Sequence, residues 1–141
     1  MAEAMRYSGG CLCGALRWEA RAEPLYQGHC YCADCRKASG SGFVPYMGFA
    51  ADTLTITGET LSYGSPSANG NIALRNSCPR CGGLVFGGEV GVSEEFTIYA
   101  GSLDDPEQFQ PNAAIFTQGR PDWAAIPAHF AVFERMPPDA G

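Results

Sequence analysis

Apolar and polar side chains alternate along several short segments of the chain. Residues 16–21 alternate with a period of two, and residues 53–57 do the same while being rich in threonine. This period is typical of a β-strand with one buried face. Residues 60–63 follow directly after Gly58 and Glu59, so the sequence predicts a hairpin between 53–57 and 60–63. Further strands are expected at residues 72–74, 84–86, 96–100 and 130–133.

Helical periodicity is weak throughout the chain. A short helical turn is expected after Cys35, through residues 36–38, and Gly40 would stop it. A second turn is expected at residues 105–109, where a proline suits the first helical turn. The Gly-, Ser- and Asn-rich stretch 64–71 predicts one mobile loop. With 141 residues and neither repeat nor linker, residues 1–141 are expected to form one mainly β domain with little helix.

The composition indicates that the fold needs a crosslink such as a metal, and it argues against nucleic acid and membrane partners. The chain has 18 glycines and 10 prolines, which implies many turns, and small domains of this kind often need a metal or other crosslink. Its net charge of −6 argues against nucleic acid and against an anionic membrane surface as partners. No apolar run approaches the ~18 residues of a membrane span, and residues 1–6 do not look like a signal peptide. We therefore expect a cytoplasmic protein, and the oligomeric state stays open.

Seven cysteines fall into three clusters, which are Cys11 and Cys13, then Cys30, Cys32 and Cys35, then Cys78 and Cys81. An odd number excludes a complete internal disulfide set, and in a reducing compartment clustered cysteines more often bind metal. A disulfide framework stays an alternative only for an exported protein. Two cysteines separated by two residues and followed by glycine are typical of a zinc knuckle, because the tight turn directs both sulfurs to one ion.

The cluster sizes predict two different zinc sites. Structural zinc prefers four ligands in a closed tetrahedron, which the first and third clusters supply as Cys11, Cys13, Cys78 and Cys81. The middle cluster then offers three thiolates and leaves one position for a ligand, as in catalytic zinc sites. Three thiolates and Zn²⁺ sum to a charge of −1, which favours handling a thiol over activating water.

Several neighbouring residues have alternative interpretations. His29 could close the middle site as a fourth ligand, although it is adjacent to Cys30. Asp34 could move protons or simply be solvated, and His129 is expected in the core or on the surface rather than at a metal. Trp18 and Trp123 are expected in the core rather than as a platform for a substrate.

The cysteine motifs and their surroundings carry a resemblance to a known family. They are Gly10-Cys11-Leu12-Cys13-Gly14, Cys30 with Cys32, Cys35 and Arg36, Ser39-Gly40-Ser41, Cys78-Pro79 with Cys81-Gly82, the segments 100–106 and 111–116, and Trp123. Together they resemble the glutathione-dependent formaldehyde-activating enzyme and centromere protein V family. Two positions depart from the family pattern, because Tyr31 and Ala114 stand where many members have histidine.

The resemblance implies a β-tent fold with two zinc ions per chain, one structural on Cys11, Cys13, Cys78 and Cys81 and one catalytic on Cys30, Cys32 and Cys35. It also implies a carbon–sulfur lyase that acts on the adduct of glutathione and formaldehyde, S-hydroxymethylglutathione.

We add the hypothesis that backbone N–H groups around Ser39, Gly40 and Ser41 bind a carboxylate of the thiol carrier, and that Asp34 or His29 relays the proton. The alternatives are a non-catalytic, zinc-stabilised binding module and a redox dithiol at Cys32 and Cys35.

Overall fold

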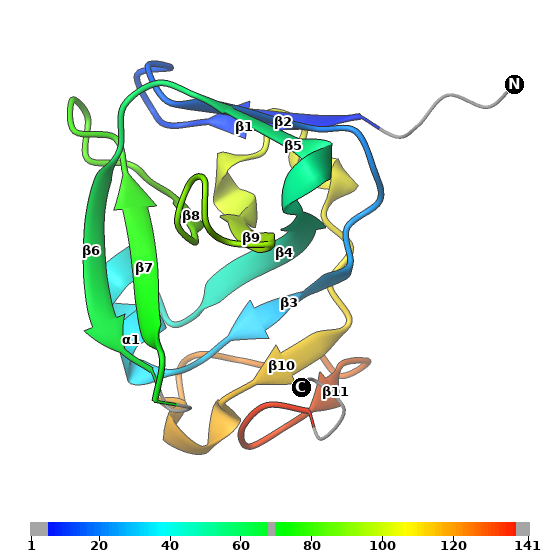
Figure 1. Cartoon of the computed structure of the whole chain (residues 1–141). Helices are drawn as coiled ribbons and strands as arrows, with labels where there is room; N and C mark the ends of the chain where they lie inside the picture. Colours follow the sequence, from blue (N-terminus) through cyan, green and yellow to red (C-terminus); the bar gives the residue numbers. More distant parts are fainter. Residues whose placement is uncertain (1–5, 68–69, 138–141) are drawn as a thin grey trace, which may run out of the picture.

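The computed structural model describes residues 6–67 and 70–137, and it places their strands in two sheets (Figure 1). A three-stranded antiparallel sheet has the order β1-β2-β5, with β1 at Tyr7–Gly10, β2 at Arg17–Ala20 and β5 at Leu54–Thr57. An eight-stranded sheet has the order β11-β10-β3-β4-β9-β8-β7-β6. Its strands are β3 (Tyr26–Cys30), β4 (Val44–Ala50), β6 (Leu61–Pro66), β7 (Ile72–Ser77), β8 (Leu84–Gly87), β9 (Glu95–Tyr99), β10 (Ala113–Ile115) and β11 (Ala131–Val132). The expected mainly β fold with little helix is confirmed.

The main core lies between these two sheets. Trp18 of β2 contacts Phe49 of β4, with ring centroids 6.0 Å apart, and the Trp18 indole N–H donates to the Ser102 hydroxyl at 2.9 Å. On the same face of the large sheet Met47 is paired with Ile98, and both side chains are fully buried. Burying a large apolar side chain stabilises a fold by about 1.5–3 kcal/mol, so this interface accounts for much of the packing between the sheets.

The hairpin expected between residues 53–57 and 60–63 does not form. Strand β5 pairs with β2 and places Ile56 opposite Trp18, whereas β6 pairs with β7 in the other sheet. The chain turns between the sheets at Gly58, whose φ of 109° is accessible to glycine. The apolar face of β5 is thus used against the core, and β6 remains an edge strand that is exposed over most of its length.

The glycine-rich stretch 64–71 is partly a strand. Residues 64–66 complete β6 and pair with residues 72–74 of β7, so the prediction of one loop over 64–71 is wrong at its start. Residues 68 and 69 of that prediction lie outside the described residues. Gly and Pro interrupt the alternation in β1, β3 and β4, as Gly28 does in β3 and Gly48 in β4, so the pattern does not predict these strands. Strand β10 has only three residues, which is too short for alternation to show. Strand β10 also pairs in parallel with both of its neighbours.

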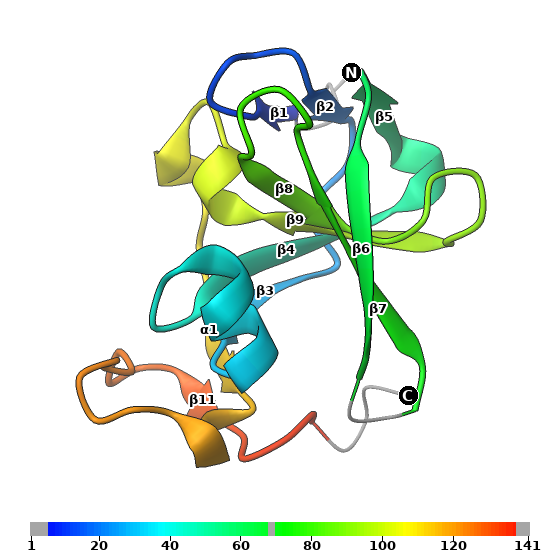
Figure 2. The same ribbon diagram turned by 90° about the vertical axis from the view of Figure 1, so that its left-hand side faces the viewer.

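The expected helical turns are present, and the first begins earlier than predicted. Helix α1 spans Ala33–Ser39, because the Cys32 sulfur caps it by accepting from the Cys35 N–H, and it ends at Gly40 with a φ of 68°. It lies beside β3 and β4, away from the three-stranded sheet (Figures 1 and 2). The second turn is a 3-10 helix at Pro106–Gln108, capped by the Asp105 side chain. Short 3-10 turns also occur at Ala51–Thr53, Ala100–Ser102 and Thr117–Gly119.

The two tryptophans differ in burial. Trp18 is in the core as expected, but Trp123 is 71% exposed, so its predicted core position is wrong. Trp123 belongs to the segment between β10 and β11, outside both sheets, and its ring lies against Gly42. It has no sheet face to cover it there.

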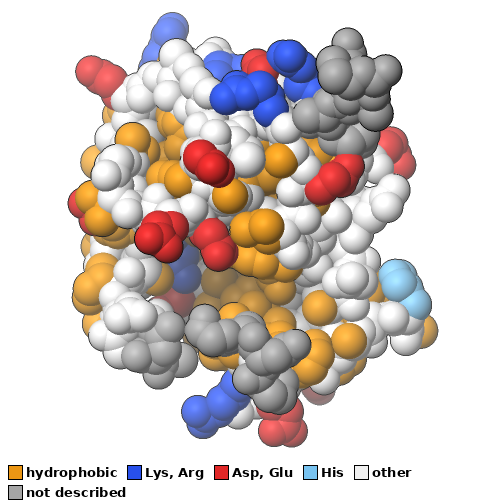
Figure 3. All heavy atoms as spheres, turned by 45° about the vertical axis from the view of Figure 1, so that its right-hand side comes forward, with side chains coloured by type: hydrophobic (Ala, Val, Ile, Leu, Met, Phe, Trp, Pro, Cys, Tyr) orange, Lys and Arg blue, Asp and Glu red, His pale blue; other side chains and the backbone are white. Residues whose placement is uncertain are grey.

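The surface in Figure 3 carries Asp and Glu side chains spread between hydrophobic ones, with Lys and Arg gathered mainly at one edge. Within residues 6–67 and 70–137, no helix has the length and apolar character needed to cross a membrane.

Candidate metal centres

Four cysteine sulfurs meet where two turns from different sheets approach each other. Cys11 and Cys13 lie in the turn between β1 and β2, and Cys78 and Cys81 lie in the turn between β7 and β8. All four sulfurs lie within 4.8 Å of one another, and the Cys11–Cys13 and Cys13–Cys78 sulfur pairs are each 3.7 Å apart. Tetrahedral zinc with bonds of about 2.3 Å requires sulfurs about 3.8 Å apart, so this set fits zinc.

Backbone N–H groups surround the four sulfurs. Leu16 donates to the Cys11 sulfur at 3.3 Å, and Arg80 donates to the Cys78 sulfur at 3.3 Å. Gly14 and Gly82, with φ of 82° and 77°, close the two turns in the left-handed region. N–H donors favour the thiolate over the thiol, which is the form that binds metal. The turns therefore bring together four sulfurs that could hold one metal ion.

The remaining three cysteines come from one short segment. Cys30 ends β3, Cys32 caps α1 and Cys35 lies in its first turns, and their sulfurs are all within 4.8 Å of one another. The Cys30 and Cys35 sulfurs are 3.3 Å apart. Both residues are buried in a small apolar cluster with three further buried side chains, Val44, Tyr46 and Ile115.

The surroundings of this second cluster favour negative charge on one sulfur, that of Cys32. The neighbouring thiols and burial raise the pKa of Cys30, and the pKa of Cys35 is raised as well. The neighbouring thiols of Cys30 and Cys35, the Cys35 N–H at 3.2 Å and the positive charge of Arg75 together lower the pKa of Cys32. The Arg75 guanidinium also donates to the Cys35 sulfur through Nη2 at 3.7 Å. Arg75 was missed in the sequence, because nothing in the cysteine spacing indicates that β7 brings a cation to this point.

His29 does not join the cluster, so the interpretation in which it completes the second site is wrong. Successive residues of a strand face opposite ways, and His29 is directed away from Cys30 into an aromatic cluster. Its ring stacks on Phe43 at 4.0 Å and meets Phe130 edge-on at 4.9 Å. Burial lowers the pKa of His29 to about 4, so the imidazole is neutral near pH 7.

The two departures from the family pattern lie in this same aromatic cluster. Tyr31 and Ala114 are fully buried with Phe130, and Ala114 is paired with His29 across β10 and β3. The Tyr31 hydroxyl donates to the Ala125 carbonyl at 2.9 Å. Neither residue belongs to the cluster around Cys30 and Cys35.

The remaining predicted site residues lie around α1. The N–H groups of Gly40 and Ser41 both donate to the Arg36 carbonyl, at 2.9 and 3.3 Å, and the Ser39 hydroxyl donates to the Cys35 carbonyl. These donors close the end of the helix, so the prediction that residues 39–41 bind a carboxylate gains no support from them and stays a prediction. Asp34 is exposed in the first turn of α1, and its role as a proton relay also stays a prediction. His129 is on the surface.

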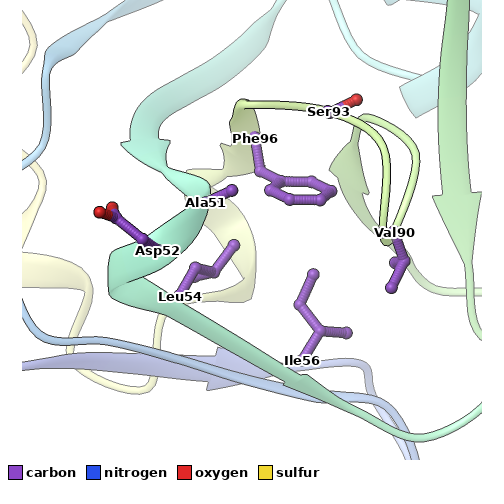
Figure 4. A pocket seen from close by; sticks show the side chains of 8 residues that line it. Ala51, Asp52, Leu54, Ile56, Val90, Ser93 and Phe96 are labelled. Carbon is purple, nitrogen blue, oxygen red and sulfur yellow. The ribbon is translucent and has the colours of Figure 1, made fainter.

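A separate hollow of about 390 Å³ lies between β5 and the loop before β9 (Figure 4). Leu54, Ile56, Val90 and Phe96 line it together with Asp52. Its lining includes none of the seven cysteines and only one ionisable side chain, so it has no group of side chains suited to bind a metal or to catalyse a reaction. A second hollow, of about 440 Å³, lies beside Cys11 and the Arg17–Asp104 pair.

The fold and the two clusters define a mainly β protein with two groups of thiolates suited to zinc. The sequence matches the family model of the glutathione-dependent formaldehyde-activating enzyme over residues 6–119. The chain therefore belongs to the glutathione-dependent formaldehyde-activating enzyme family.

A crystal structure of a Rhodobacter sphaeroides protein has the same fold. The two are 21% identical with a TM-score of 0.54, over 72% of this chain and 93% of that chain. Likeness at this identity shows the fold alone. No curated protein matches the sequence.

Proposed function

We propose that this protein is a zinc-dependent carbon–sulfur lyase acting on a thiol–aldehyde adduct such as S-hydroxymethylglutathione. Membership of the family supports a function connected with glutathione and formaldehyde. One observation carries the finer proposal. Three cysteine sulfurs from one six-residue segment lie close together, with apolar side chains packed against them and the Arg75 guanidinium beside them.

The donor set decides the chemistry. Zinc is four-coordinate, so the three thiolates of Cys30, Cys32 and Cys35 leave one position for an exchangeable ligand. A zinc ion held there would keep a thiol deprotonated near neutral pH, which is the form that bonds to a carbonyl carbon. The four sulfurs of the other cluster complete a tetrahedron by themselves, so we assign that cluster a structural role.

The proposed reaction breaks or forms one C–S bond and moves one proton. In the lyase direction the C–S bond of the hydroxymethyl adduct breaks, the hydroxyl proton leaves, and formaldehyde and the thiolate are released. In the reverse direction the sulfur electron pair forms the C–S bond and the carbonyl oxygen takes a proton. Val44, Tyr46 and Ile115 keep water from one side of the cysteine cluster, and Asp34 is our candidate for moving the proton at the exposed side.

Cobalt substitution tests the proposal, because sulfur-to-cobalt charge-transfer bands report the number of bound thiolates. Glutathione should change the bands of the Cys30, Cys32 and Cys35 site and leave those of the four-cysteine site unchanged. S-methylglutathione, which has no thiol, is the matched control and should have no effect. The Cys32→Ser variant should lose the response.

The outcomes separate the alternatives. A response to another small thiol but not to glutathione would keep the lyase class and change the substrate. A spectrum indifferent to every thiol would contradict the proposal and favour a zinc-stabilised binding module. Oxidation of Cys32 and Cys35 with loss of metal would favour the redox dithiol.

A further inference from the structure

The face of the eight-stranded sheet opposite the main core carries a row of polar and aromatic side chains that leads to the second cysteine cluster. Cross-strand register pairs Tyr46 with Tyr99 and Arg75 with Gly87. Gly87 is in turn paired with Thr97, which is two residues from Tyr99 and therefore on the same face of β9. Cys30 lies on this same face, because it is two residues from Gly28, the partner of Tyr46. Tyr46, Tyr99, Arg75 and Cys30 therefore share one face of the sheet.

Glycines leave room on this face for the tyrosine side chains. A Cβ at Gly28 would lie 2.7 Å from the Tyr46 hydroxyl, and one at Gly87 would lie 3.0 Å from the Tyr99 hydroxyl. Burial raises the pKa of both tyrosines, so both are neutral phenols near pH 7. The charge on this face near the cysteines therefore comes from Arg75 and from the sulfurs themselves.

Arg75 is fixed by contacts on two sides. Nη1 donates to the Ser65 hydroxyl of β6 at 3.1 Å, and Nη2 donates to the Cys35 sulfur at 3.7 Å. The side chain is neither fully buried nor freely exposed. A guanidinium has five N–H donors in a planar fork, so these two contacts use only part of its capacity. Within the described residues, it is the one cationic side chain placed in hydrogen-bonding range of a cysteine sulfur.

The positive charge of Arg75 changes how the cysteine site interacts with a charged thiol. Three thiolates and a zinc ion carry −1 together, and a fourth thiolate makes the site −2. Without a nearby cation, such a site would repel a thiol whose carrier bears carboxylates. A guanidinium in contact with Cys35 offsets that repulsion and can meet a carboxylate with its remaining donors.

We propose that Arg75 is a specificity-determining residue that selects thiols with a negatively charged carrier for the site of Cys30, Cys32 and Cys35. This inference rests on the proposed function and names its substrate class, a small anionic thiol of which glutathione is one. Ser65 acts as the positioning residue that fixes the guanidinium from the neighbouring strand.

The test compares three thiols of different charge on the cobalt-substituted protein. Glutathione is anionic, 2-mercaptoethanol is neutral and cysteamine is cationic, and the affinity of each is read from the charge-transfer bands. Arg75→Gln should weaken glutathione by about tenfold or more, weaken 2-mercaptoethanol less, and leave cysteamine unchanged or tighter. Arg75→Lys keeps the charge and should restore much of the preference. Arg21→Gln removes an exposed arginine that follows β2, outside both cysteine clusters, and should change none of the three affinities.

A second measurement needs no variant, in case Arg75→Gln fails to fold. The wild-type protein should bind glutathione more tightly than its diethyl ester, which keeps the thiol and loses both carboxylates. If wild-type protein responds to thiols but does not distinguish the ester, or if Arg75→Gln weakens all three thiols alike, the inference is overturned and the proposed function stands. If wild-type protein responds to no thiol, the proposed function fails and the inference fails with it.

Discussion

The two cysteine clusters use the same side chain in opposite structural settings. The four-cysteine cluster joins residues 65 positions apart, Cys13 and Cys78, and it connects a turn of each sheet. The three-cysteine cluster is contained in the six residues from Cys30 to Cys35, which run from the end of β3 into α1. Cys13 is exposed, whereas Cys30 and Cys35 are buried beside Arg75.

This difference in sequence separation implies a difference in role. A metal that joins distant turns binds only when both turns are in place, so its binding free energy stabilises the folded chain and substitutes for missing core. A metal held within one short segment restricts little of the chain, so its presence contributes mainly to local order. The first cluster is therefore expected to govern folding, and the second to govern ligand binding.

The largest expected effect is the loss of the four-cysteine cluster. Cys81→Ser should leave the protein unfolded or strongly destabilised, because structural zinc supplies about 10 kcal/mol or more of apparent folding free energy in small zinc domains. Thermal unfolding followed by circular dichroism, together with zinc analysis, measures this. A Cys81→Ser protein that melts like wild type would contradict the assigned role.

The matching change in the other cluster should be much milder. Cys32→Ser should give a folded protein that retains the metal of the four-cysteine cluster and loses the other. It also removes the sulfur that caps α1, and a lost cap costs about 0.5–2 kcal/mol. If Cys32→Ser and Cys81→Ser lose both metals and melt alike, the comparison between the clusters fails.

A change at His29 sharpens the boundary of the second cluster. His29 stacks within an aromatic cluster and faces away from Cys30, so His29→Phe should keep both metals. A swap of similar volume in a packed site usually costs less than about 1.5 kcal/mol. Elemental analysis is the decisive readout here, and loss of one zinc per chain would restore His29 as a ligand.

The smallest expected effect concerns the surface beside the four-cysteine cluster. Arg17 donates to Asp104 at 2.9 Å, and the Ser8 hydroxyl also donates to that carboxylate at 2.8 Å. Asp104→Asn should lower stability by less than about 1 kcal/mol, because the pair is solvent-exposed. The difference from wild type should shrink as salt is raised. A loss comparable to that of Cys81→Ser would show that this surface, rather than the metal, holds the turn in place.

Local patterns predicted several strands but not how they pair. The alternation at residues 16–21 and 53–57 marks β2 and β5, and both segments do place apolar side chains in the core. The pairing of β5 with β2 rather than β6 depends on packing against Trp18, which is distant in sequence from β5. The alternation does not predict β3 and β4, because these strands contain glycines that accommodate tyrosine rings, as Gly48 does for Tyr26.

The cysteine positions were predictable because metal binding constrains the spacing of ligands directly. Spacing divides the seven residues into the same two groups that the structure brings together. The surroundings were not predictable in this way. Arg75 reaches Cys35 only through four successive strand pairings, which run from β3 through β4, β9 and β8 to β7. The direction of His29 depends on which face of β3 carries Cys30.

The central claim, that two metal sites divide folding from ligand binding, is tested most directly by native mass spectrometry during titration with a zinc chelator. The wild-type protein should begin with about two zinc ions per chain, one for each cluster. It should lose the first ion without a change in its charge-state distribution, which reports a still compact chain, and lose the second together with unfolding. In Cys32→Ser only the second step should remain. Loss of both ions in a single step with unfolding, or a starting protein with fewer than two, would contradict the account.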